Sequence, residues 1–374
     1  MNNTFKFDYN NSILSVSNSL LKYYGLPTYH PSLKFLDEKL NKNPQNVILM
    51  ILDGMGVDLI EKNLPKTSFI RQHLSSSIFS VFPPTTAAAT TAFHSGLSPW
   101  ESGWIGWMSY YKQYDEIIEN FRNTAFYSGK KLNTPAPMEE ILKYETIYEK
   151  IVRKNPSLEY HKIFPPFEKG GVNSFEEMCS KIISLTKKNT NPKLFCAYWT
   201  EPDHSVHKFG TTASEIKNIL TDIDINLQKL NTELNDSLVI VSADHGEIDV
   251  DEIYLNDYPH LCEMFIRPPA LEARFITFFI KEDKHSEFHT EFNKIFSSQF
   301  KLFSKQDFIK SGLLGSGVPH TQLFDFLGDF IAISTSEKSL RYTTGEKVFA
   351  SLKADHAGIS EQEMHVPLII LEKY

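Results

Sequence analysis

Three continuous apolar runs constrain the fold of this chain more than any other feature of its sequence. They span residues 46–52, 193–200 and 236–243, and each has the length of a strand. Strands without polar alternation are buried on both faces, as in a parallel sheet that helices cover on both sides. Between residues 216 and 234, apolar positions recur at helical spacing and predict one covering helix. These patterns predict an α/β fold with a mostly parallel central sheet and helices on both of its faces.

Acidic side chains follow all three runs. Asp53 and Asp244 come directly after the first and third runs, and Asp203 lies on the predicted loop that follows the second. Ligands of open α/β sheets bind at the carboxyl ends of strands, so these acids are candidates for a binding site. His207 can reach one metal together with Asp203, and adjacent Asp244 and His245 would be costly to bury unpaired, which favours metal ligation. Taken alone, Asp53 could equally cap a helix, and the Asp203–His207 pair could equally lie on the surface.

The segment from residue 82 to residue 103 carries a second signal. A short predicted strand, 78–82, is stopped by two prolines, and a helix of small residues is expected from about Thr85–Thr86 to Gly96. A hydroxyl at that helix start lies beside unpaired backbone N–H groups, where anions are favoured. A threonine that only caps the helix is the simpler explanation when the segment is taken alone.

The remaining chain is less regular. We expect a single domain spanning residues 1–374, with cap-like insertions at about 104–190 and 250–345. Further expected elements are helices at 12–25, about 138–153, 174–187 and 286–314, a helix with a capping box at Thr212–Glu215, and strands at 273–280, 329–333 and 363–370. An aromatic cluster in the first insertion is expected to pack rather than to stack on a substrate ring: Trp104, Trp107, Tyr110 and Tyr111. Four histidines lack ligand-like neighbours: His260, His285, His289 and His320.

Charge and composition exclude several classes of function. The net charge of −8 provides no basic field for a nucleic-acid polymer, and an acidic protein that acts on phosphate esters would need cations in its site. No run approaches the roughly 18 apolar residues of a membrane span, and the first residues do not have a signal-peptide pattern. The protein is therefore expected in the cytoplasm without a membrane partner. Three widely spaced cysteines argue against a disulfide framework.

The candidate residues form a set of oxygen and imidazole ligands without a thiolate. Such ligands suit two divalent ions such as zinc or manganese. Two metal ions can clamp the attacking and leaving oxygens of a phosphoryl displacement. A threonine hydroxyl is a poor nucleophile until metal coordination helps to ionise it.

The order of these motifs resembles the alkaline phosphatase superfamily, and most closely its type I phosphodiesterase/nucleotide pyrophosphatase branch. The similarity covers about residues 45–110, 190–250 and 350–372. Segment 82–103 aligns without a gap with the nucleophile segment of that branch, which puts the nucleophile on Thr86 rather than Thr85.

The resemblance implies an alkaline phosphatase-like fold and two metal sites. One metal would be surrounded by Asp53, Thr86, Asp244 and His245, and the other would be held by Asp203, His207 and His356. Zinc is the expected ion in both sites and manganese the second choice. The implied activity is hydrolysis of phosphodiester bonds in a small phosphate ester, nucleotide pyrophosphates included, through a phosphorylated threonine.

Two departures from the branch bear on the substrate. Ala89 stands where nucleotide pyrophosphatases have an asparagine that supports a phosphate oxygen, which weakens the case for nucleotides. Val206 replaces the usual glycine before the metal-binding histidine, and neither change removes a ligand.

Alternatives remain open on the same scaffold. A phosphomonoester or phosphonate hydrolase is the main one, but segment 82–103 has no Arg or Lys for the extra charge of a monoester, which favours diesters. Sulfatase chemistry lacks its Cys/Ser-x-Pro-x-Arg motif. A degenerate metal-binding module is opposed by the suitable side chains at all seven ligand positions. The oligomeric state is not predicted.

Overall fold

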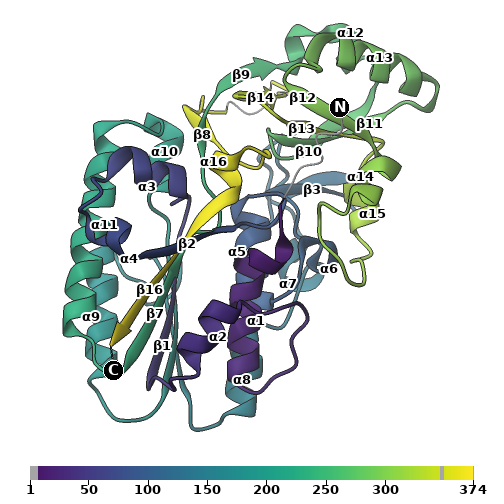
Figure 1. Cartoon of the computed structure of the whole chain (residues 1–374). Coiled ribbons are helices and arrows are strands. Elements are labelled where there is room, and N and C mark those ends of the chain that lie inside the picture. Colours follow the sequence, from purple (N-terminus) through teal and green to yellow (C-terminus); the bar gives the residue numbers. More distant parts are fainter. Residues whose placement is uncertain (1–6, 346–348, 374) are drawn as a thin grey trace.

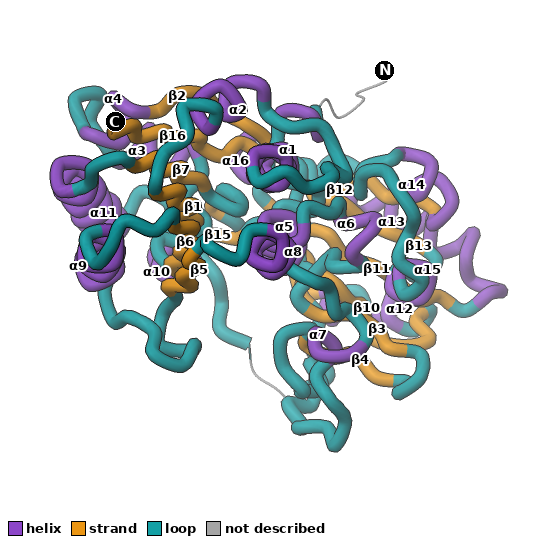
Figure 2. Tube along the Cα trace, turned by 90° about the horizontal axis from the view of Figure 1, so that it is seen from below, coloured by secondary structure: helices purple, strands orange, loops and turns teal. Residues whose placement is uncertain are grey.

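A computed structural model describes residues 7–345 and 349–373 of the chain. Figures 1 and 2 show two sheets that lie beside each other, each with its own helices. Within the described residues, every helix is too short or too polar to cross a bilayer. Cys179, Cys196 and Cys262 are free thiols, as expected.

The first sheet has six strands in the order β2-β16-β7-β1-β6-β5. Their bounds are β1 Asn46–Leu52, β2 Leu74–Phe79, β5 Glu159–Ile163, β6 Lys193–Trp199, β7 Ser237–Ser242 and β16 His365–Lys373. β1 pairs in parallel with both β6 and β7, so that Leu49 lies opposite Cys196 on one side and Ile240 on the other. Only β16 runs antiparallel to its neighbours. The predicted mostly parallel sheet with fully buried central strands is confirmed.

Helices cover both faces of this sheet (Figures 1 and 2). One face carries α1 (Ile13–Tyr23), α2 (Lys34–Leu40), α5 (Thr86–Ser95) and α8 (Ile147–Lys154). The other carries α3 (Val57–Asn63), α4 (Phe69–His73), α9 (Phe175–Thr186) and α11 (Ser214–Glu233). In α11 the apolar positions at helical spacing are buried as predicted: Ile216, Leu220, Ile223, Leu227 and Leu230.

The second sheet is antiparallel and has the order β12-β13-β11-β10-β3-β4. Its strands are β3 Met108–Tyr111, β4 Glu116–Glu119, β10 Phe265–Leu271, β11 Phe275–Ile280, β12 Phe300–Ser304 and β13 Phe330–Ser334. Two segments that are far apart in the sequence therefore build it together. By contrast, β5, α8 and α9 fall in segment 104–190 but belong to the first sheet and its helices.

Further elements surround the second sheet and the junction of the two sheets. The helices are α6 Pro99–Ser102, α7 Pro137–Glu140, α10 Asp203–Phe209, α12 Pro259–Cys262, α13 His285–Phe296, α14 Lys305–Ser311, α15 Leu323–Phe326 and α16 Glu361–Met364. The 3₁₀ turns are η1 Tyr9–Asn11, η2 Leu255–Asp257 and η3 Glu282–Lys284, and two small ladders pair β9 Asp251–Tyr254 with β14 Lys338–Arg341 and β8 Ile248–Asp249 with β15 Ala354–Asp355.

Helix α5 lies where the two hydrophobic cores meet. Ala89 and Phe93 belong to the core of the first sheet, whereas Ala87 packs in a cluster with Phe275 of β11. Small side chains allow this close packing on both sides of the helix. Gly96 ends the helix with φ 72°, in the left-handed conformation predicted for it.

Several predicted boundaries were wrong. The helix at 286–314 is α13, β12 and α14: α13 ends at Phe296 although the apolar spacing of four continues to Phe300, and Ser304 caps a new helix by accepting a bond from Asp307 N–H. The helix at 138–153 is two helices, α7 and α8. The predicted strand 363–370 begins instead at His365, because a capping box starts α16 just before it.

Two errors concern elements next to the site. The strand expected at 78–82 is β2, which ends at Phe79. Helix α11 begins at Ser214 after Ala213, whose side chain makes no capping bond, so the capping box predicted at Thr212–Glu215 is absent there.

Candidate active site

The carboxyl ends of β1, β6 and β7 meet at one edge of the first sheet because these strands are parallel neighbours. Asp53 N–H donates to Trp199 O over 2.9 Å, and Asp203 N–H donates to Asp53 O over 3.0 Å. Gly54 N–H donates to Asp244 Oδ1 over 3.1 Å. The backbone thus brings the three predicted acids together.

Thr86, Asp53 and His245 form the first half of the site. Thr86 Oγ1 lies 3.1 Å from His245 Nε2 and 3.5 Å from Asp53 Oδ1. His245 Nε2 lies 3.3 Å from the same Asp53 oxygen and 3.6 Å from Asp244 Oδ2. Asp53, Asp244 and His245 are all buried, so the Thr86 hydroxyl faces a cluster of polar side chains that solvent does not reach.

Asp203, His207 and His356 form the second half. Asp203 and His207 lie on helix α10 rather than on the predicted loop, so their spacing of four residues puts both on one helix face. His207 Nε2 lies 3.3 Å and His356 Nε2 3.7 Å from Asp203 Oδ1. His207 Nδ1 lies 2.8 Å from Ala354 O, a bond that leaves Nε2 free to bind a ligand.

The two halves are continuous. The His245 and His356 rings are 3.8 Å apart between centroids, and Asp203 belongs to both groups of potential ligands. Within each group, Asp53–Asp203–His245 and Asp203–His207–His356, one ligand atom per residue lies within 4.8 Å of the others. All seven predicted site residues are therefore assembled at one place.

Burial and the closeness of several carboxylates shift the pKa values of the residues in this cluster. Burial and the charge of Asp203 raise the pKa of Asp53, and burial and the charge of Asp53 raise the pKa of Asp244 to about 8. Burial alone would lower the pKa of His245, but the carboxylates of Asp244 and Asp53 raise it to about 10. Burial and two nearby histidines lower the pKa of His356 well below its usual range.

Unpaired atoms show that the residues fit divalent metal ions. Buried side-chain atoms of the site without a hydrogen-bond partner include Asp203 Oδ1, Asp244 Oδ2 and His356 Nδ1. Buried polar atoms are normally paired, and cations would neutralise the repulsion among these acids. Carboxylate and imidazole donors match zinc and manganese.

Thr85 and Thr86 are adjacent but have different environments. Thr85 Oγ1 donates to Glu272 Oε1 over 2.7 Å instead of capping α5. Thr86 begins the helix and faces Asp53 and His245. The structure therefore directs the Thr86 hydroxyl, and not that of Thr85, toward the acids.

Three further residues of the site were missed by the sequence analysis. The Tyr198 hydroxyl donates to Asp53 Oδ2, and the Glu247 carboxylate is buried beside His207. Glu272 comes from the end of β10 and accepts bonds from Thr85 and from Trp107 N–H, while burial raises its pKa to about 7. Glu247 could have been predicted as a site residue, because it directly follows Asp244-His245-Gly246 in the sequence. Glu272 could not, because only the fold of the second sheet brings it close to Thr85.

The aromatic cluster of the first insertion mostly packs. Trp104, Tyr110 and Tyr111 are buried, and Trp104 Nε1 donates to Leu142 O. Trp107 is half-buried, with the Arg122 guanidinium 5.7 Å from its ring centre. The Trp107 ring also lies 5.4 Å, between centroids, from that of Phe121, so the expectation of packing fits all four residues.

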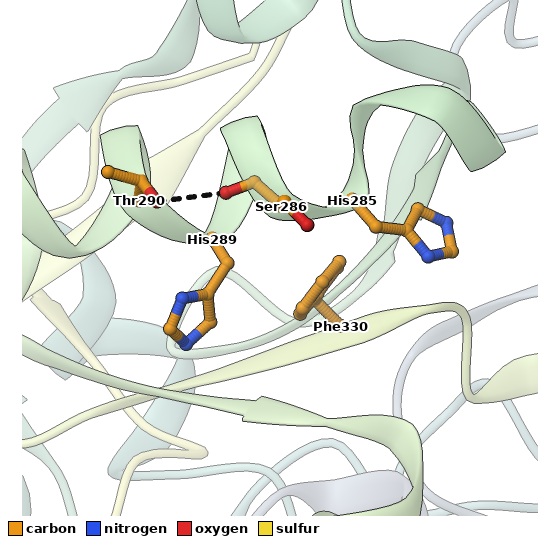
Figure 3. A pocket seen from close by; sticks show the side chains of 5 residues that line it. All are labelled: His285, Ser286, His289, Thr290 and Phe330. Atoms are coloured by element: carbon orange, nitrogen blue, oxygen red, sulfur yellow. Dashed lines mark hydrogen bonds between the residues drawn. The ribbon is translucent and has the colours of Figure 1, made fainter.

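Histidines outside the site do not join it. Figure 3 shows a pocket on α13 in which His285 and His289 point to opposite sides of Phe330. His285 Nε2 lies 3.2 Å from Ile280 O, and His289 Nε2 accepts from Asn293 over 3.2 Å. Neither they nor His260 and His320 occur in a metal-ligand group among the described residues.

Comparison with known proteins places this geometry in context. The family model of type I phosphodiesterase / nucleotide pyrophosphatase matches residues 47–358. No curated protein matches the chain.

Solved structures share the fold at low sequence identity. Human ectonucleotide pyrophosphatase/phosphodiesterase 5 is 17% identical with a TM-score of 0.64, and an inactive variant of the murine protein in complex with AMP is 16% identical with a TM-score of 0.63; both alignments cover 87% of each chain. Phosphonoacetate hydrolase from Sinorhizobium meliloti 1021 in complex with phosphonoformate is 15% identical with a TM-score of 0.59, over 88% of this chain and 91% of that one.

Proposed function

We propose, from the premise that this chain belongs to the type I phosphodiesterase / nucleotide pyrophosphatase family, that it is a two-metal phosphodiesterase with Thr86 as its nucleophile. The observation that carries the proposal is the position of the Thr86 hydroxyl, 3.1 Å from His245 Nε2 and 3.5 Å from Asp53 Oδ1 at the start of α5. The substrate class is a small phosphate ester, with nucleotide pyrophosphates as one candidate.

Seven residues would hold the two metal ions. Asp53, Asp244 and His245 with Thr86 would surround one, and Asp203, His207 and His356 would hold the other. Bound divalent ions would supply the positive charge that ionises the threonine and stabilises the leaving oxygen. Zinc is the favoured ion and manganese the second.

The chain's own residues account for the covalent steps. Thr86 gives up its hydroxyl proton to water and its Oγ attacks phosphorus, so that an Oγ–P bond forms while the bond from phosphorus to the leaving oxygen breaks, and the departing alkoxide takes a proton from water. Water then attacks the phosphothreonine and the Oγ–P bond breaks; the phosphorus keeps the hydroxyl of that water and leaves as a phosphomonoester, while the other proton restores the Thr86 hydroxyl. The amino end of α5 favours the negative charge that builds on the phosphoryl oxygens.

A phosphonate or phosphomonoester hydrolase is the second candidate. Its support is Ala89, which provides no amide for a phosphate oxygen, and the likeness in fold to phosphonoacetate hydrolase. The absence of Arg and Lys from residues 82–103 favours the diester, because a monoester carries an additional charge.

Hydrolysis of bis-p-nitrophenyl phosphate and p-nitrophenyl phosphate, each with zinc and with manganese, tests the proposal. We expect diester preference, and Thr86→Ala should lower kcat by at least about 1,000-fold because the nucleophile is lost. Metal content measured on the same preparations should remain nearly unchanged.

Thr85→Ala is the matched control, since it removes the neighbouring hydroxyl and should keep most of the diesterase rate. Full activity of Thr86→Ala would refute the mechanism. Monoester preference would establish the second candidate instead, and less than one equivalent of bound metal in the wild type would favour a non-catalytic binding module.

A further inference from the structure

Glu247 is a buried carboxylate that the proposed mechanism does not use. Its side chain is fully shielded from solvent, and neither of its oxygens has a hydrogen-bond partner. An unpaired buried carboxylate is costly, because burial removes its hydration without replacing it. Such a group in a native fold calls for a compensating positive charge.

The surroundings of Glu247 show where that charge would come from. Glu247 Oε2 lies 3.9 Å from His207 Nδ1, on the side of the imidazole opposite to the nitrogen that faces Asp203. Among the described residues, no Lys or Arg forms an ion pair with Glu247, and the positive groups nearest to it are the imidazoles of His207 and His245.

The backbone keeps this carboxylate in place. Gly54 has φ +70°, and a Cβ atom added there would lie 2.6 Å from Glu247 Oε1 and 2.8 Å from Asp203 Cβ. The glycine therefore leaves room for Glu247 to pack directly behind Asp203 and His207. His207 Nδ1 is already hydrogen-bonded to Ala354 O, which fixes the ring, so Glu247 at 3.9 Å acts on the imidazole through its charge and strengthens it as a ligand.

We propose that Glu247 is a positioning residue of the metal centre, whose buried carboxylate beside His207 Nδ1 raises the affinity of the Asp203–His207–His356 group for a divalent cation. The inference rests on the proposed function, because it requires that this group binds metal. Glu247 does not contact the substrate in this scheme; it acts through His207.

Zinc affinity, measured by competition with a chromophoric chelator, tests this role without reference to activity. Glu247→Gln keeps the shape of the side chain and removes its charge, and we expect it to weaken zinc binding by about 10–100-fold. The metal-free variant should unfold at the same temperature as the metal-free wild type or higher, because an unpaired buried acid has been removed. A purely structural role would lower both the affinity and the unfolding temperature, and that result would overturn the proposal.

Glu101→Gln is the control, since Glu101 is a partly buried glutamate outside the site that is already hydrogen-bonded to Ser98 and His30. It should keep its zinc affinity within about twofold, a difference well below 1 kcal/mol. An equal loss in both variants would indicate a general effect of negative charge and would overturn the specific role. If the wild type itself binds no zinc, the proposed function fails; if wild type and Glu247→Gln bind it equally, only this inference fails.

Discussion

The buried ion pair between Arg274 and Glu363 offers the sharpest test of how the two sheets are joined. Arg274 Nε and Nη2 donate to Glu363 Oε1 and Oε2 over 2.7 and 2.8 Å, and neither side chain is exposed. Arg274 also donates to Lys338 O and Ser336 O, each over 2.9 Å. Burial alone would raise the pKa of Glu363, but the Arg274 charge together with hydrogen bonds from Arg274, Ser360 and Gly358 lowers it.

Replacing Arg274 by Met keeps much of its volume and removes its charge and all its donors. Breaking a buried pair on one side destabilises a protein by about 3–5 kcal/mol, because the remaining charge is left uncompensated. Two backbone carbonyls also lose a donor, so we expect Arg274→Met near the upper end of this range. The double variant Arg274→Met/Glu363→Met leaves no isolated charge and should recover much of the loss.

Urea unfolding at 25 °C measures these changes, read as a lower midpoint at an unchanged slope. Lys187→Met is the control, because Lys187 and Glu233 form an exposed pair at 2.8 Å that should contribute less than about 1 kcal/mol. A loss below about 1 kcal/mol for Arg274→Met, or a double variant less stable than Arg274→Met alone, would refute the reasoning.

Two further predictions concern pH and metal. Burial and nearby Lys162 lower the pKa of His94 to about 4, whereas a histidine in the unfolded chain has a pKa of about 6.5. Between these two pH values the unfolded chain binds one proton more than the folded protein. The folded state therefore loses stability as the pH falls from about 6.5 toward 4. His94→Gln should reduce this loss in unfolding experiments at pH 7 and pH 5, and an unchanged pH dependence would contradict the assignment. Removal of metal with EDTA should lower the unfolding temperature, and addition of zinc or manganese should restore it. Ions at about 100 times their Kd stabilise the folded state by about 2.7 kcal/mol. An unfolding temperature that does not change when EDTA is added would argue against a metal centre.

The first sheet and the acids at its strand ends were predictable because their signals are local. Strand β1 is apolar at nearly every position, and Asp53 follows it directly, so strand, boundary and candidate ligand come from one stretch of sequence. The same holds for β7 and Asp244.

The second sheet was less predictable because its contacts are distant in sequence. Phe288 and Phe292 have helical spacing that continues into β12 without a strong break, so α13 could not be separated from the strand that follows. Leu271 has φ +80°, a backbone conformation that is rare for leucine and that no sequence pattern predicts. The next residue, Glu272, accepts a hydrogen bond from Thr85. Such placements depend on tertiary packing rather than on local propensity.

Strand β16 lies between β2 and β7, and this order has a consequence for synthesis on the ribosome. Residues 365–373 pair with β2, but β2 and the helix that carries Thr86 are made nearly 300 residues earlier, an interval of roughly 15–60 s at about 5–20 residues per second. During that time the backbone N–H and C=O groups of β2 that later pair with β16 have no strand beside them. The three consecutive serines of β2, Ser75–Ser77, make this unpaired strand polar. The nascent chain therefore carries Thr86, the proposed nucleophile, long before β16 completes the first sheet, and we expect the proposed hydrolysis to begin only after that last strand has been added.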